Sequence, residues 1–159
     1  MSQRLSFAEN KETAISAIKY LLGKLKVPVT TRTITETLQQ HPDYPSLLSI
    51  NDPLHRWKID NICLRTDPEK LSELAPPLIA YFREEGGIFI IITDIKNDGI
   101  TYMNPAQSPK PISKTRTDFL KIWNGVVLVA ETNNQSGEKD YKLSRRKESL
   151  RQLIEFVKR

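Results

Sequence analysis

The alternation of apolar and polar positions divides the chain into a helical first part and a strand-rich second part. In residues 9–25, apolar side chains recur at steps of three and four, which predicts an amphipathic helix with Asn10 as its N-cap. We expect a second helix over residues 31–40 and a third helical segment within 41–59, where Pro53 predicts a kink or a restart. The first part should therefore form helices with one apolar face each.

The strongest strand signal is the sequence GGIFIIITDIKNDGITYMNP at residues 86–105. Its run from Ile88 to Ile92 is β-branched and aromatic and too short for a buried helix, so it predicts a central strand. Asn97-Asp98-Gly99 predicts a tight turn, because Gly adopts positive φ without steric cost, and residues 100–104 form the return strand. An isolated hairpin is marginal in water, so other elements must extend and cover it.

Shorter signals extend this hairpin into a sheet. We expect strands over residues 61–65, 78–82 and 125–130, a short helix opening at 67–69, a loop over 105–112, and another short helix over 115–123. Because the helices come first and the antiparallel strands follow, the order predicts an α+β fold. A doubly wound α/β fold would alternate helices and strands.

The composition changes after residue 131. Residues 132–139, TNNQSGEK, are typical of a linker, and a basic helix is expected over residues 143–157. Its apolar side chains fall on one face, at Leu150, Leu153, Ile154 and Val157. The predicted organisation is a folded domain at 1–131, a linker at 132–142 and a basic, helical, membrane-proximal tail at 143–159.

The positive charge is concentrated in this tail. The net charge of the 159 residues is +5, yet residues 1–137 carry 16 Lys or Arg against 15 Asp or Glu, and residues 138–159 carry 8 against 4. No apolar run approaches the ~20 residues needed to cross a bilayer, and the N-terminus lacks the apolar segment of a secretory signal. We therefore expect the chain as given to be neither exported nor inserted.

Motifs for metals and cofactors are not found. His41 and His55 lie 14 residues apart and Cys63 is the single cysteine, so no spacing converges on a metal ion. There is no Walker sequence and no Gly-x-Gly-x-x-Gly after a strand, and Gly86-Gly87 is too short to hold a phosphate. We expect neither a metal nor a cofactor.

Cys63 is the one candidate for a thiol nucleophile. Such a thiol must be ionised and aligned with a base, but Cys63 lies in a predicted strand between Ile62 and Leu64, and His55 precedes it on a predicted helix. Free cysteine is among the residue types that are most often buried. The sequence favours Cys63 as a small buried hydrophobic residue, and His55 as a residue at the surface or the edge of the core.

Three strings together resemble a known family: HPDYPSLLSINDPLHRWKIDN, the hairpin GGIFIIITDIKNDGITYMNP, and FLKIWNGVVLVAE. They resemble the bacteriocin-processing peptidase domain, family thirty-nine of the cysteine peptidases, which is a papain-like fold at the N-terminus of peptide and toxin exporters of the ATP-binding-cassette (ABC) type. The resemblance covers residues 9–131. The HPDYPSLL string, with SGEKDY and the basic Arg145-Arg146-Lys147, is similar to the bacterial version joined to a vitamin K epoxide reductase-like membrane domain, often followed by a thioredoxin domain.

The resemblance also implies what this chain lacks. In the family a nucleophilic Cys begins an early helix, a His begins the central strand, and an Asp ends the return strand; the counterparts here are Thr13, Ile88 and Asn104. Ile88 cannot accept a proton and Asn104 cannot stabilise an imidazolium, so the Cys-His-Asp machinery is absent as a unit. Cys63 cannot replace it, because no His follows it in the chain.

The resemblance then implies recognition without hydrolysis. We expect a non-catalytic peptidase-like domain that binds a peptide or leader, or docks within its own membrane protein, on the cytoplasmic side of the bacterial inner membrane. Tyr44, Trp57, Tyr102 and Trp123 are candidate peptide contacts, because amphipathic aromatic residues suit interfaces, although aromatics on predicted elements also dominate cores.

Two alternatives make different predictions. An active cysteine peptidase would cleave double-glycine leader peptides with a reactive Cys63. A nucleic-acid-binding domain acting through the tail would lose affinity steeply with salt, and entirely on removal of residues 138–159. We expect no nucleic-acid partner, because the tail has few aromatics between its cations.

Overall fold

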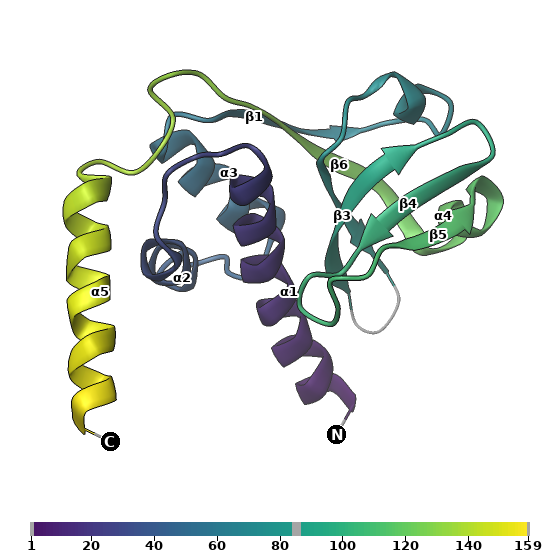
Figure 1. Cartoon of the computed structure of the whole chain (residues 1–159). Helices are drawn as coiled ribbons and strands as arrows, with labels where there is room; N and C mark the ends of the chain where they lie inside the picture. Colours follow the sequence, from purple (N-terminus) through teal and green to yellow (C-terminus); the bar gives the residue numbers. More distant parts are fainter. Residues whose placement is uncertain (1, 84–86, 159) are drawn as a thin grey trace.

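The computed structural model describes residues 2–83 and 87–158, and the side chains of 13–83 and 87–158. The predicted approach to the central strand at 84–86 lies outside the described residues. The described chain forms a helical layer against an antiparallel sheet, with a C-terminal helix set apart from both (Figure 1). This confirms the predicted α+β fold.

Three helices form the first layer: α1 (Ser2–Lys24), α2 (Thr31–Gln39) and α3 (Leu47–Arg56). The expected N-cap at Asn10 is wrong, because α1 already begins at Ser2. The expected restart at Pro53 is also wrong, since α3 runs through it. The fully buried Ile50 and Leu54 pack on either side of Pro53, and their burial offsets the cost of about 3 kcal/mol that an interior proline imposes.

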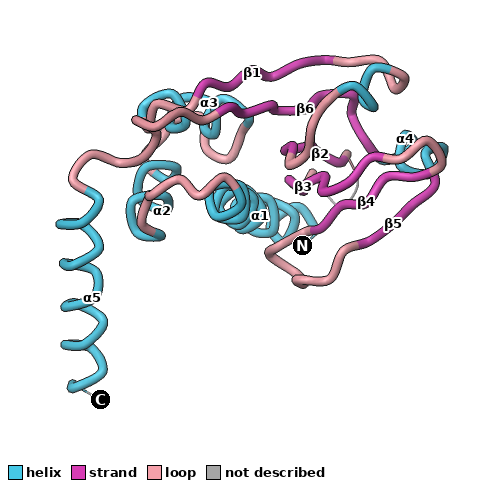
Figure 2. The backbone as a smooth tube through the Cα atoms, turned by 45° about the horizontal axis from the view of Figure 1, so that its top comes forward, coloured by secondary structure: helices cyan, strands magenta, loops and turns pink. Residues whose placement is uncertain are grey.

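The sheet has six described strands in the order β1-β6-β2-β3-β4-β5, each antiparallel to its neighbour (Figure 2). The hairpin predicted from the sequence is formed by β3 and β4, with Ile92 opposite Tyr102. The short strand β5 was not predicted, and it lies between the loop expected over residues 105–112 and the helix expected over 115–123. The bounds are β1 (Asp60–Arg65), β2 (Leu78–Phe82), β3 (Ile88–Ile95), β4 (Gly99–Met103), β5 (Ile112–Thr115) and β6 (Trp123–Glu131), with the short helices η1 (Lys70–Glu73) and α4 (Arg116–Ile122).

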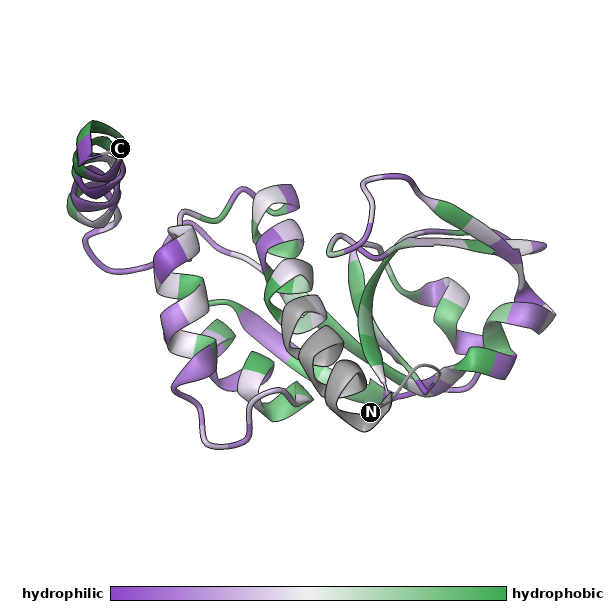
Figure 3. Ribbon diagram, turned by 90° about the horizontal axis from the view of Figure 1, so that it is seen from below, coloured by the Kyte–Doolittle hydropathy of each residue, from purple (hydrophilic) through white to green (hydrophobic). Residues whose placement is uncertain are grey.

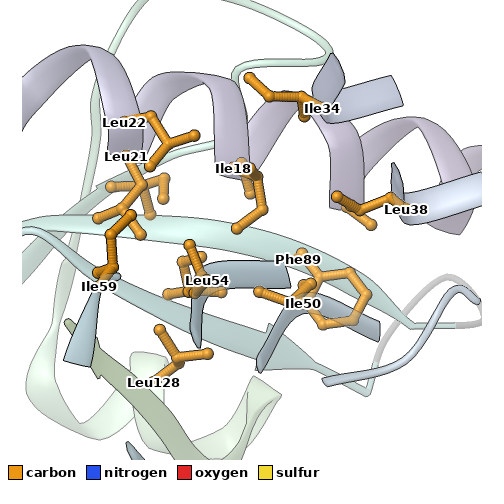
Figure 4. Close-up of a cluster of buried hydrophobic side chains, with 14 of the residues drawn as sticks. Ile18, Leu21, Leu22, Ile34, Leu38, Ile50, Leu54, Ile59, Phe89 and Leu128 are labelled. Carbon is orange, nitrogen blue, oxygen red and sulfur yellow. The ribbon is translucent and has the colours of Figure 1, made fainter. Parts of the chain in front are cut away.

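Both faces of the sheet are buried, and each has its own core. On one face the apolar stripe of α1 meets β3, together with residues of α2 and α3 (Figure 4). On the other face, Phe119 of α4 packs with Phe82 and Tyr102 at ring-centroid distances of 5.5 and 5.8 Å. Apolar residues therefore line β2 and β3 on both sides, while polar residues follow the outer edges (Figure 3).

A buried hydrogen bond fixes α1 against the first residues of β3. The Thr13 hydroxyl oxygen accepts from the Phe89 backbone N–H at 3.1 Å, and Thr13 is only 2% exposed. The next turns of α1 place Ala14, Ala17 and Ile18 against the sheet with no exposed surface. The small side chains of the two alanines let the helix approach the sheet closely.

The segment after β6 is attached to the helical layer. The Glu138 carboxylate accepts from the Thr30 backbone N–H at 2.5 Å and from the Thr33 hydroxyl at 2.8 Å, at the N-terminus of α2. The Gly137 N–H donates to the Trp57 carbonyl at 2.7 Å. A carboxylate is stabilised at a helix N-terminus because the backbone N–H groups there have no helical partner.

These contacts place the last helix, α5 (Tyr141–Lys158), beside α2 (Figures 1 and 2). It covers the helix predicted over residues 143–157 and extends it by two residues at its start. Within the described residues, no helix is both long and apolar enough to cross a membrane.

Replacing Glu138 with glutamine should loosen this attachment. Glu138→Gln keeps the side-chain shape but removes the charge that strengthens two hydrogen bonds at α2. We expect a loss of about 1 to 2 kcal/mol in the free energy of unfolding, measured by urea denaturation. Glu131→Gln, at the exposed end of β6, is the matched control and should change little. An equal effect of the two substitutions would contradict the proposed attachment.

Replacing Thr13 with valine should destabilise the junction of α1 and β3. Thr13→Val keeps the branched shape but leaves the buried Phe89 N–H without its acceptor, at a cost of about 1 to 3 kcal/mol in the free energy of unfolding. Thr35→Val, which removes a hydroxyl from the more accessible α2, is the control. If both variants unfold at the same urea concentration, the hydrogen bond does not stabilise the junction.

Candidate functional site

The structure brings Thr13 to the start of β3, where its neighbour is Phe89. Phe89 packs in the core beneath α1, whereas Ile88 packs with Ile90 in the core on the opposite face. Successive residues of a strand point to opposite faces, so Ile88 is directed away from the Thr13 hydroxyl. The residue of β3 that meets Thr13 is therefore Phe89, which the sequence did not single out.

Asn104 follows β4 and is 5% exposed. Its Oδ1 accepts from the Ala106 N–H at 3.1 Å, and its carbonyl accepts from the Gln107 N–H at 3.0 Å. Its Nδ2 is buried and has no hydrogen-bond partner among the described residues. Asn104 and Ile88 line the same small pocket of about 140 Å³. The structure thus brings Ile88 and Asn104 together, but not with the Thr13 hydroxyl.

Cys63 lies on β1, the edge strand of the sheet. The expectation that it is buried is wrong, because β1 pairs only with β6 and leaves Cys63 exposed. The atoms that do surround the sulfur partly desolvate it, which raises the pKa of the Cys63 thiol above its ordinary value. A raised pKa keeps the group in its protonated, weakly nucleophilic form at neutral pH.

Neither imidazole of the described chain is placed to activate this thiol. The His41 Nε2 lies 2.7 Å from the Asp52 Oδ2, and its Nδ1 accepts from the Asp43 N–H at 3.1 Å, so both ring nitrogens are engaged. His55 is exposed on α3. No hydrogen bond joins Cys63 to either histidine among the described residues.

The four aromatic candidates differ in burial. Trp57 is 3% exposed, and Tyr102 and Trp123 are each 5% exposed. Their rings belong to the two cores, which leaves Trp57 and Trp123 little exposed surface, while Tyr102 also lines the pocket shared by Ile88 and Asn104. Tyr44 remains as a candidate: it is half-buried at the edge of the first core, and burial raises the pKa of its hydroxyl to about 12.

A cleft opens between the helical layer and the sheet, close to the junction of Thr13 and Phe89. It has a volume of about 240 Å³. Tyr81 and Phe89 form its sheet side, with their ring centroids 5.0 Å apart and edge to face. The helical side comes from the segment that enters α3, so that the cleft is lined by Pro45, Ser46, Leu47, Tyr81, Phe89 and Asn124.

Gly87 lies against Tyr81, whose ring lines this cleft. Its φ of +96° and its closeness to Tyr81 both exclude a side chain, because a Cβ at Gly87 would fall 1.7 Å from the Tyr81 hydroxyl oxygen. The sequence could have indicated that Tyr81 and Phe89 point to the same side of the sheet, since each alternates along its strand with residues that point to the other face. No sequence pattern indicates Leu47 or Asn124 as lining residues, because only the fold brings them to the cleft.

The described residues hold no cluster of three or more His, Cys, Asp or Glu side chains that could bind a metal ion. The chemistry that the cleft offers is therefore an apolar surface with a polar rim. Asn124 lies at this rim, and its Oδ1 already accepts from the Val126 N–H at 3.0 Å.

Solved structures share this fold at low sequence identity. A double-glycine-motif protease from an AMS/PCAT transporter, solved with its leader peptide, has a TM-score of 0.64 and 16% identity, with 79% of this chain and 85% of that chain covered. The peptidase domain of Streptococcus ComA, a bifunctional ABC transporter of a quorum-sensing pathway, has a TM-score of 0.64 and 13% identity, with 79% and 93% covered.

A third structure is the N-terminal peptidase C39-like domain of a toxin secretion ATP-binding protein from Vibrio parahaemolyticus. It has a TM-score of 0.60 and 17% identity, with 76% of this chain and 96% of that chain covered. No curated protein matches the sequence. The model of the Peptidase C39 family, however, matches residues 5–135, which is most of the chain. This chain therefore belongs to the Peptidase C39 family.

Proposed function

We propose that this C39 domain binds an extended peptide in the cleft beside Tyr81 and Phe89 and does not cleave it. One solved structure with the same fold holds a leader peptide. The observation that carries the proposal is that the cysteine thiol of this chain lies apart from both histidine imidazoles. The single thiol, Cys63, lies on the edge strand β1, and no hydrogen bond links it to either histidine among the described residues. A cysteine peptidase requires both groups within hydrogen-bond reach of each other.

The junction of α1 and β3 supports the same reading. Its hydroxyl, on Thr13, accepts a hydrogen bond from the Phe89 backbone and lies almost fully buried. Its neighbour on β3 is Phe89, and neither Phe89 nor Ile88, which points to the opposite face, can take a proton. A substrate carbonyl at this point would meet no activated nucleophile.

The walls of the cleft suit one apolar side chain of an extended peptide. Leu47, Tyr81 and Phe89 offer apolar contact, and the amide group of Asn124 is positioned at the rim to bond a peptide backbone. Burial of one large apolar side chain contributes about 1.5 to 3 kcal/mol. Such a site selects a leader by its apolar positions rather than by charge.

We infer that the domain works inside a larger membrane protein, at the cytoplasmic side of a bacterial membrane. Solved relatives of the same fold are domains of ABC transporters. The division into a peptide-binding domain at 1–131, a connecting segment at 132–142 and a tail at 143–159 is part of this proposal. The larger protein is either an exporter or a reductase fusion, and the sequence of the parent gene distinguishes them. A Walker sequence indicates an exporter, and transmembrane segments with a CxxC pair indicate a reductase fusion.

Peptide binding is tested with two adjacent leucines. Leu47 lines the cleft, whereas Leu48 is 50% exposed and does not line it. With a fluorescent double-glycine leader peptide, fluorescence anisotropy should show saturable binding. Leu47→Glu should weaken this binding at least about tenfold, because a carboxylate replaces an apolar contact.

Leu48→Glu is the matched control and should bind like the parent chain, with thermal unfolding confirming that both variants fold. Absence of binding to the parent chain would contradict the proposal. An equal loss in both variants would place the peptide elsewhere.

The reactivity of Cys63 tests the alternative of an active peptidase. Because the pKa of its thiol is raised, the rate of alkylation by iodoacetamide should be low at neutral pH and should rise with a midpoint above the ordinary value of 9.0. Mass spectrometry of the intact chain follows the reaction, and Cys63→Ser gives the background. A midpoint well below 9.0 would indicate an activated thiol and would favour the peptidase.

A further inference from the structure

The helix α5 exposes an apolar stripe, which is uninterrupted from Leu150 to Val157 and is joined by Leu143 earlier in the helix, beyond Arg146 and Lys147. At about 3.6 residues per turn, its large aliphatic side chains fall on one side of the helix. Each of them is between 53% and 75% exposed. An exposed apolar face of this kind marks an interaction surface rather than an ordinary protein exterior. The apolar stripe consists of Leu143, Leu150, Leu153, Ile154 and Val157.

The polar side of α5 faces the domain, and the stripe faces away from it. Tyr141, Arg145, Glu148 and Gln152, which recur every three or four residues, line a hollow shared with Thr31 at the start of α2. On a helical projection these four positions lie opposite Leu143, Leu150 and Val157. The bonds of Glu138 to α2 hold the start of the helix in this orientation. The stripe is thus on the side of α5 that faces away from α2.

Cations flank the stripe. The described helix carries six Lys or Arg and two Glu, while residues 1–137 of the chain are close to neutral. On a helical projection Lys142 lies on one border of the stripe and Lys158 on the other, with Arg146 on the same side of the helix as the stripe; Lys147, next to Lys158 on the projection, also lines a hollow shared with α2. The combination of an outward apolar stripe with a cationic border is typical of helices that lie in the plane of a membrane surface.

We propose that α5 docks on an anionic lipid surface, with the apolar stripe among the acyl chains and the flanking cations at the headgroups. Charge complementarity selects this partner. A second copy of the helix would bring two net charges of +4 together, and its two heptads are shorter than the three or four of a stable coiled coil. A nucleic acid would neutralise the cations but would leave the stripe in water.

Docking of α5 sets the distance and the orientation of the domain relative to the lipid surface. Because α2 lies on the opposite side of α5, across a hollow that the two helices line, the helical layer comes next above the lipid and the sheet lies farther away (Figure 2). The surface is separate from the cleft beside Tyr81 and Phe89. Lipid binding therefore does not depend on peptide binding, and each proposal can fail without the other.

Flotation with lipid vesicles tests the proposal on the 159-residue chain. Vesicles of phosphatidylcholine containing a third of phosphatidylglycerol should carry the protein, and vesicles of phosphatidylcholine alone should not. Each Lys or Arg near an anionic surface raises partitioning about fivefold, so Lys142→Glu with Arg146→Glu should reduce binding more than about tenfold. Raising the salt toward about 1 M, where the Debye length is about 3 Å, should also release the protein.

Matched variants distinguish binding through the α5 surface from a general effect of the net charge of the chain. Lys70→Glu with Lys110→Glu changes the net charge equally but away from α5, and should bind nearly as the parent chain does. Leu150→Glu, in the stripe, should abolish flotation, whereas Gln152→Glu, on the side facing α2, should keep most of it. Circular dichroism verifies that α5 remains helical in each variant.

Three results would overturn the proposal. The first is equal flotation with neutral and anionic vesicles. The second is equal loss in Leu150→Glu and Gln152→Glu. The third is a dimer, detected by sedimentation, that Leu150→Glu dissolves while no vesicle is bound.

Discussion

The structure depends on how closely α1 approaches β3. Ala14, Ala17 and Ile18 have no exposed surface, and the Thr13 hydroxyl accepts from the Phe89 N–H at 3.1 Å. The alanines permit this approach and the hydrogen bond sets its register, so the helix covers one face of the central strand and leaves the cleft beside it. The same contact buries Thr13. Because its hydroxyl oxygen accepts from a backbone N–H in the core, this hydroxyl is not available to solvent or substrate.

The same junction decides whether the domain only binds a peptide or also hydrolyses it. A hydrolytic site would need a thiolate and an imidazole there, and the junction instead offers a buried hydroxyl beside a phenylalanine. The thiol that the chain does have lies on the edge strand, with its pKa raised. What remains near the junction is an apolar cleft with a polar rim. On the far side of the helical layer, Glu138 ties the segment before α5 to the start of α2, so the surface proposed for lipid lies apart from the cleft proposed for the peptide.

Local patterns predicted most elements, and the surroundings decided the rest. The β3–β4 hairpin followed from Asn97-Asp98-Gly99 and its flanking apolar runs, and α2 from its apolar spacing. The positive φ expected at Gly99 was wrong, because this residue already begins β4 in the extended conformation. The exposure of Cys63 could not be predicted, because residue type does not reveal that β1 is an edge strand. In the same way α3 passes through Pro53 since tertiary packing outweighs a local preference. The placement of Phe89 rather than Ile88 beside Thr13 required the strand register, which only the fold supplies.

The most direct test of the account is mass spectrometry of a double-glycine leader peptide after prolonged incubation with a stoichiometric amount of the chain. The account predicts that the peptide is recovered bound and at full length, with the parent chain and with Cys63→Ala alike. A product that ends at the double glycine, formed by the parent chain and lost in Cys63→Ala, would contradict it.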